Sequence, residues 1–203
     1  MVTARLSRWN LSLGALAAIG LAIRLGAVAG RPSLRVGGDA AFYHGEANLL
    51  VAGRGWIDPF IYQATHTHVQ SASFPPLFTV LLGMASLLGA KSFLAQRIWC
   101  CLIGSSAVVL AGLTGKTVAG RRVGLISAAL VAIYPNLWMS SDLGLSETLS
   151  PVAVLAVLFA AYRFWQCPTI RRSVVLGGTL ALAALARDEL AVLAVLLVLP
   201  LVV

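Results

Sequence analysis

The chain has 203 residues, of which 59% are hydrophobic and only 11% charged, and its mean hydropathy is +0.90. Soluble domains are about half apolar and a quarter charged, so this composition excludes an ordinary soluble globular protein. The net charge of +8 does not indicate a nucleic-acid partner, because the basic residues are spread between apolar runs instead of gathering on one face. We therefore expect an all-α polytopic protein, a single membrane-embedded domain over residues 1–203, with the lipid bilayer as its partner and no nucleic acid.

The first apolar run, residues 11–29, is long enough to span a bilayer. Arg5 and Arg8 precede it, which predicts a cytoplasmic N-terminus by the positive-inside rule. A cleaved signal peptide is the alternative, because Ala27-Val28-Ala29 resembles a cleavage site. The run carries Arg24 and further spans follow it, so we interpret it as an uncleaved anchor.

The stretch 31–75 is the only long polar segment, and it holds three of the seven acids and all three histidines. The apolar piece that follows, 76–89, would rise only about 21 Å as a helix, at about 1.5 Å per residue, which is short of the ~30 Å hydrocarbon core. We therefore predict that 31–95 is an external loop with interfacial helices, lying between the first two spans.

Charge supports this topology. If 76–89 stays at the interface, the six basic residues of the two later polar turns all face the cytoplasm, as the positive-inside rule expects. All seven acids then share the external face. The predicted fold has about five to six transmembrane helices, at 11–29, 96–115, 123–140, 148–165 and 173–187, with a last apolar run from 190.

The segment after the Gly37-Gly38 pair reads as a short helix opened by Asp39. Asp39, Tyr43 and Glu46 are four and seven residues apart, which places them on one helical face. One interpretation makes Asp39 only the N-cap of this helix, where an aspartate stabilises free backbone N–H groups. The other makes these three residues part of an active site facing outward.

Several short motifs follow one another in an order that is typical of one family. They are Gly38-Asp39-Ala40-Ala41-Phe42-Tyr43, Ala52-Gly53-Arg54-Gly55, Ala72-Ser73-Phe74-Pro75-Pro76-Leu77-Phe78, Leu94-Ala95-Gln96-Arg97, Val118-Ala119-Gly120-Arg121-Arg122-Val123-Gly124, Tyr134-Pro135-Asn136-Leu137-Trp138, Leu145-Ser146-Glu147-Thr148-Leu149 and Leu185-Ala186-Arg187-Asp188-Glu189. In these motifs the chain resembles the GT-C glycosyltransferase superfamily, close to glycosyltransferase family 39, with its bacterial relatives of protein O-mannosyltransferases and lipid A aminoarabinose transferases. The resemblance runs from the first span to the last residue.

The resemblance implies that Asp39 is the catalytic carboxylate of the first external loop. Transfer of a sugar from a polyprenyl-phosphate donor needs a base for the proton of the acceptor hydroxyl. Many relatives follow this aspartate with a second acidic residue, and this chain has Ala40 instead. Glu147 or Asp142 is the candidate for the second carboxylate, although Glu147 could equally serve the first turn of the fourth helix.

The leaving phosphate needs positive charge or a metal ion rather than an acid. Arg24 and Arg187 are the candidate phosphate ligands, because guanidinium groups bind phosphate in a bidentate manner and charges at membrane depth are commonly functional. Snorkelling to the headgroups is the alternative for Arg24. Tyr43 and Glu46 are further candidate substrate-binding residues. A divalent cation, Mg²⁺ or Mn²⁺, would have Asp39 and Glu147 as ligands.

The sequence therefore predicts a glycosyltransferase of the cell envelope, with its active site on the periplasmic side of a bacterial inner membrane. The alternatives are a transporter or lipid-handling membrane protein, or an inactive truncated remnant of the transferase. Relatives in the family are longer, so we expect an N-terminal portion whose C-terminal portion is separately encoded. The pair His66 and His68 lacks a third ligand at a recognisable spacing, and we interpret it as polar loop rather than a metal site.

Overall fold

The computed structural model describes residues 8–35 and 37–202, so the predicted cytoplasmic Arg5 lies outside the described residues. Within these ranges the regular secondary structure is helical, apart from one isolated bridge between Ile57 and Gln70. The predicted all-α fold is confirmed. The helices are α1 (Arg8–Gly30), α2 (Gly38–Val51), α3 (Pro59–Thr65), α4 (Pro76–Leu87), α5 (Phe93–Ala119), α6 (Arg121–Ile133), α7 (Pro135–Leu143), α8 (Leu149–Gln166), α9 (Ile170–Ala186) and α10 (Leu199–Val202).

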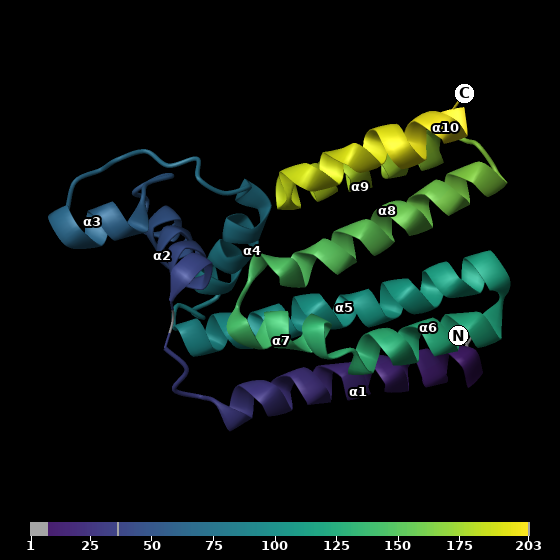
Figure 1. Ribbon diagram of the computed structural model, residues 1–203, viewed down its shortest axis with the longest axis horizontal. Coiled ribbons are helices and arrows are strands. Elements are labelled where there is room, and N and C mark those ends of the chain that lie inside the picture. The colour runs from purple at the N-terminus through teal and green to yellow at the C-terminus, as the bar shows by residue number, and fades with distance from the viewer. Residues whose placement is uncertain (1–7, 36, 203) are drawn as a thin grey trace, which may run out of the picture.

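The long helices form a bundle, and the segment between α1 and α5 forms a cap at one of its ends (Figure 1). α5 contacts α1, α6 and α8, and α8 contacts α9 in turn. The cap consists of α2, α3 and α4 (Figure 1). The turns from α5 to α6 and from α8 to α9 lie at the opposite end, together with the start of α1 (Figure 1).

Three helical segments in the described part of the chain are long and apolar enough to cross a membrane: Arg8–Gly30, Phe93–Ala119 and Ser146–Gln166. They coincide with three of the predicted spans. The predicted span at 123–140 is instead a bent pair, because α6 and α7 meet at an angle of 47°. Pro135 is the first residue of α7 and has no N–H, and the residue before it, Tyr134, is extended; both effects break a helix.

The part of the chain after α8 departs furthest from the predicted spans. α9 occupies the predicted span 173–187, but it has only 17 residues, carries Arg171 and Arg172 in its first turn, and is not among the helices long and apolar enough to cross. The run after 190 is broken into a 3₁₀ segment (Asp188–Ala191), a π segment (Ala194–Val198) and α10. The helix expected to be too short for a span is confirmed as short, since α4 has 12 residues.

Close packing between α5 and α6 depends on glycine. A Cβ atom built on Gly124 would lie 2.5 Å from the carbonyl oxygen of Gly112, so position 124 has no room for a side chain. Close backbone approach through small residues is how helices associate where lipid offers no hydrophobic driving force. The outward faces of the bundle are apolar, with Leu130 60% and Val174 68% exposed. This distribution favours a lipid environment.

A chain of polar contacts holds the cap on the bundle. The Thr79 hydroxyl of α4 donates to the Glu46 carboxylate of α2 over 2.8 Å. Ser86 of α4 donates to Asn48 of α2 over 2.8 Å and accepts from Gln96 of α5 over 2.9 Å. Buried polar groups satisfied in this way fix one arrangement of the elements. The cap is therefore tied to the bundle by specific bonds as well as by apolar packing.

A buried ion pair joins α5 to α7. Both oxygens of the Asp142 carboxylate accept from arginines, one from Arg97 of α5 and one from Arg31 of the loop after α1. Arg97 also donates to the backbone carbonyl of Arg31 over 2.8 Å. The side chains of Arg97 and Asp142 are 0% exposed. These contacts therefore hold the loop after α1, the start of α5 and the end of α7 together.

Candidate functional site

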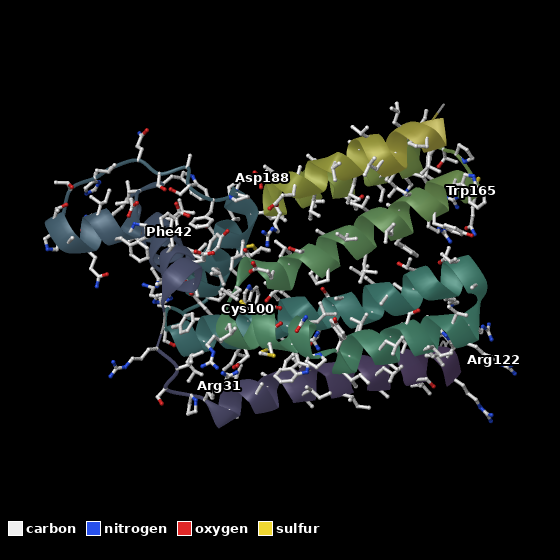
Figure 2. The ribbon with its side chains drawn as sticks, in the orientation of Figure 1. Arg31, Phe42, Cys100, Arg122, Trp165 and Asp188 are labelled. Atoms are coloured by element: carbon white, nitrogen blue, oxygen red, sulfur yellow. The ribbon has the colours of Figure 1, made fainter. Side chains whose placement is uncertain are left out.

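A pocket of about 230 Å³ lies where the cap meets the bundle. Its walls come from four regions that are distant in the sequence: the start of α2, the loop before α4, the turn that precedes α8 and the turn that follows α9. Figure 2 labels Asp188 at this end of the molecule. The lining residues are Asp39, Tyr43, Ser73, Phe74, Pro75, Ser146, Glu147, Arg187, Asp188 and Glu189.

Asp39 lies in the first turn of α2 and is exposed to the pocket. The N-cap of this helix is Gly37, whose backbone is extended, so the interpretation of Asp39 as the N-cap is wrong. Its negative charge still faces the positive end of the helix dipole. The carboxylate is thus available to a ligand instead of being used by the backbone.

Tyr43 stands one turn further along α2, and its ring is 2% exposed. The ring packs against Phe74 and Phe78, with ring centroids 5.0 Å apart in both pairs. Burial raises the pKa of the Tyr43 phenol above its ordinary value, with a smaller opposing effect from its hydrogen bond to Ser146. The hydroxyl therefore stays protonated at neutral pH and can donate a hydrogen bond at the inner end of the pocket.

Arg187 is the cation of the pocket and has two carboxylate partners. Its Nη1 donates to Glu147 over 3.1 Å, while Nε and Nη2 donate to the two oxygens of Glu189, each over 3.3 Å. The hydrogen bond to Glu189 raises the pKa of Arg187 and lowers the pKa of Glu189. A guanidinium has five N–H donors, so donors of Arg187 remain for an anionic ligand.

Four carboxylates face this one guanidinium around the pocket, which gives a formal charge of −3. Such a pocket repels an anion unless a cation enters with it. The oxygen donors suit a hard divalent ion, which in phosphate sites is held by one or two carboxylates, by water and by the phosphate itself. In the described part of the chain no three acidic, histidine or cysteine residues are grouped so as to hold a metal ion by themselves.

Comparison with family models, with curated proteins and with solved structures finds no match to this chain. What the pocket does is therefore argued from its own residues.

The structure brings four of the six predicted site residues together and leaves two apart. Asp39, Tyr43, Glu147 and Arg187 line the pocket. Glu46 is buried behind Tyr43, where it accepts from Thr79 and burial raises its pKa.

Arg24 is the second predicted residue away from the pocket. It lies within α1, is 0% exposed, and donates to the Gly20 carbonyl of its own helix over 2.9 Å. Asp142, the alternative second carboxylate, is occupied by Arg97 and Arg31 and does not line the pocket. Of the two alternatives, Glu147 is the one that faces Asp39 across the pocket.

Sequence reasoning assigned no role to Ser73, Ser146, Asp188 or Glu189, although the motifs contain all four. The signal that could have found Glu189 is its position two residues from Arg187 in an otherwise apolar region. Ser146 had no such signal, because its contact with Tyr43 joins two distant parts of the chain.

The loop histidines lie elsewhere. The ring of His68 is 5.5 Å from the ring of Tyr62, and its Nε2 is 3.5 Å from Nη1 of Arg54. The Arg54 guanidinium lies over the Tyr62 ring, 4.8 Å from its centroid. A cation in contact with His68 disfavours a metal ion there, so this cluster acts in packing the loop.

Proposed function

We propose that the chain is a membrane-embedded glycosyltransferase that moves a sugar from a polyprenyl-phosphate donor to an envelope acceptor on the external face. The observation that carries the proposal is the pocket at the acidic end of the bundle. There a free carboxylate, Asp39, a protonated phenol, Tyr43, and an arginine held by two acids, Arg187, surround one small space. A base beside a phosphate-binding cation is what this transfer needs.

Each group has a distinct task. Asp39 takes the proton of the acceptor hydroxyl as its oxygen forms a bond to the anomeric carbon. The bond between that carbon and the phosphate oxygen breaks, and the electron pair leaves on the polyprenyl phosphate. Arg187 stabilises the charge that gathers there, since arginine suits phosphate. Tyr43 donates a hydrogen bond that orients the sugar.

Glu147 and Glu189 position Arg187 and hold its charge in place. The excess of carboxylates supports a divalent cation as cofactor, Mg²⁺ or Mn²⁺, with Asp39 and Glu147 as its protein ligands. When bound, the cation would neutralise charge on the leaving phosphate.

The orientation of the chain follows from its charges. All seven acids lie in the cap or at the turns beside it, whereas the turns at the opposite end carry Lys116, Arg121, Arg122, Arg163, Arg171 and Arg172. Positive turns face the cytoplasm, so we place the pocket in the periplasm. We propose that the bent pair α6–α7, the helix α9 and the segment after α9 also cross the membrane. Together with the three long apolar helices they give five to six spans.

The deciding experiment measures sugar transfer from labelled polyprenyl-phosphate donors by membranes that carry the chain, beside the variant Asp39→Asn. Loss of the base should reduce the rate by about 10²-fold or more.

The matched control is Asp58→Asn. Asp58 belongs to the same cap but serves as the N-cap of α3, accepting from Phe60 and Ile61, and does not line the pocket. We expect Asp58→Asn to keep the rate within about twofold, since only a helix cap is altered. Equal rates for wild type and Asp39→Asn would remove Asp39 from the mechanism.

A further inference from the structure

A second pocket, of about 550 Å³, lies at the other end of the bundle, in the turn between α8 and α9. Figure 2 labels Trp165 at the end of α8 next to this turn, far from Asp188 at the acidic end. The rim carries three guanidinium groups, from Arg163, Arg171 and Arg172. None of the polyprenyl-phosphate chemistry proposed above involves this end, so the pocket requires its own explanation.

The positive charge of this rim is not compensated by the protein. Within the described residues, the guanidinium groups of Arg163 and Arg171 have no hydrogen-bond or ion-pair partner. Arg172 is held in place, since its Nη1 donates to the carbonyls of Arg163 over 2.7 Å and Cys167 over 2.9 Å. Three arginines around one hollow with no acid beside them form a site for an anion.

The walls of the pocket are apolar, which restricts the kind of anion. Phe159, Ala160 and Val175 line it below the arginines. Val175 continues onto an outer surface of α9 where Val174 is 68% and Ile170 85% exposed. A ligand with a charged head and a hydrocarbon tail matches this arrangement, whereas a small soluble anion would leave the apolar wall uncovered.

The depth of the pocket fits a lipid headgroup. Tyr162 and Trp165 lie within two residues of Arg163 and form an edge-to-face pair, with 5.3 Å between their ring centroids. Trp165 is 59% exposed. Exposed tryptophan and tyrosine mark the level of the membrane interface. Thr169, which lines the same pocket, accepts the backbone N–H of Arg172 over 3.3 Å, and its own hydrogen can go to a phosphate oxygen.

We propose that the pocket between α8 and α9 binds the phosphodiester headgroup of an anionic phospholipid of the cytoplasmic leaflet. Arg163, Arg171 and Thr169 contact the phosphate, Arg172 fixes the turn, and one acyl chain follows Val175 along α9. Basic pockets between membrane helices at this level hold such headgroups. The ligand anchors the turn at its correct depth, independently of any transfer reaction at the other end.

The test measures binding of a fluorescent phosphatidylglycerol to the purified full chain in neutral detergent, with phosphatidylcholine as the zwitterionic comparison. We expect clear preference for phosphatidylglycerol. The variant R163Q/R171Q should weaken its binding about 30-fold, because each basic residue at a membrane surface is worth about a fivefold factor in affinity. Arg172 is left unchanged because it holds the turn together.

The matched control is R121Q/R122Q. It removes the same charge from the same end of the bundle, at the turn from α5 to α6, where both arginines are exposed (Figure 2 labels Arg122). We expect it to change the affinity by less than about threefold, as a long-range charge effect alone would. An equal loss in both variants would show general attraction to the basic face and overturn the site.

A photoreactive phosphatidylglycerol, used on the unmodified chain, keeps the proposal testable if a variant does not fold. Cross-links should map to peptides spanning 159–175; cross-links confined to other regions overturn it. Inorganic phosphate in excess should not displace the lipid. Displacement of the lipid by inorganic phosphate would show a site for soluble phosphate and overturn the proposal. Equal binding of phosphatidylcholine would likewise exclude a site for an anionic lipid.

Discussion

Arg187 and Glu147 are 40 residues apart, and their side chains meet over 3.1 Å at the entrance to the carboxylate pocket. The contact joins the turn after α9 to the turn before α8. Because the same guanidinium also binds both oxygens of Glu189, its position is set by three hydrogen bonds. An arginine restrained in this way is pre-organised for a phosphate.

We predict that Arg187→Gln lowers sugar transfer by about 10²-fold, the usual cost of removing one donor that stabilises transition-state charge. The substitution also leaves four carboxylates without a cation, so binding of the anionic donor should weaken as well. Rates at several donor concentrations separate the two effects. Arg54→Gln is the control, because Arg54 is an exposed arginine of the cap that lies over Tyr62. Equal rates for the two variants would exclude Arg187 from the site.

The buried pair of Arg97 and Asp142 yields a prediction about stability. Asp142→Ala leaves the Arg97 guanidinium buried with no carboxylate, which should cost about 3–5 kcal/mol of unfolding free energy. The double variant Arg97→Met with Asp142→Leu removes both charges and should recover most of that loss. Denaturant titration of the purified chain in detergent measures these differences. A loss below about 1 kcal/mol for Asp142→Ala would show that the pair does not hold α5 to α7.

Glu46 should make the stability of the cap depend on pH. Burial raises its pKa above the ordinary value, so the folded state prefers the protonated form. Below the ordinary pKa of about 4.3 the group is neutral in both states and this contribution is fully present. As the pH rises through the raised folded-state pKa, the contribution is lost.

Glu46→Gln has no such group, so its stability relative to wild type should increase as the pH rises from about 4 to 7. The Gln amide oxygen can still accept from Thr79, which makes this a matched change. Thermal unfolding of both chains across that pH range gives the measurement. A stability difference that stays constant with pH would contradict the assignment.

Native and introduced cysteines can test the orientation of the bundle. Cys167 is exposed in the turn from α8 to α9, while Cys100 and Cys101 are 0% exposed. An impermeant thiol reagent added outside intact cells should not label the native chain. Thr67→Cys in a Cys167→Ser background, placed in the exposed loop of the cap, should be labelled. Labelling of Cys167 from outside would invert the proposed topology.

The sequence by itself determined the helical class, three of the predicted spans and the local geometry around Asp39. Apolar run length sets whether a helix can cross a bilayer, which is why Arg8–Gly30, Phe93–Ala119 and the shortness of α4 agree with prediction. Asp39 and Tyr43 share the pocket because four residues make about one helical turn. These properties depend on neighbours in the chain, and a sequence records them directly.

Only the tertiary structure decided which side chains meet across the bundle. It placed Glu46 against Thr79 instead of in the pocket, because the face of α2 that carries Tyr43 is covered by α4. It paired Asp142 with Arg97, whereas Glu147 forms its ion pair with Arg187. Asp142 lies in the last turn of α7 and Glu147 in the short turn that follows it, and their positions in the sequence do not show which of them reaches Arg187. The choice depends on how α5, α7 and α9 pack, and such long-range contacts have no local period that a sequence could reveal.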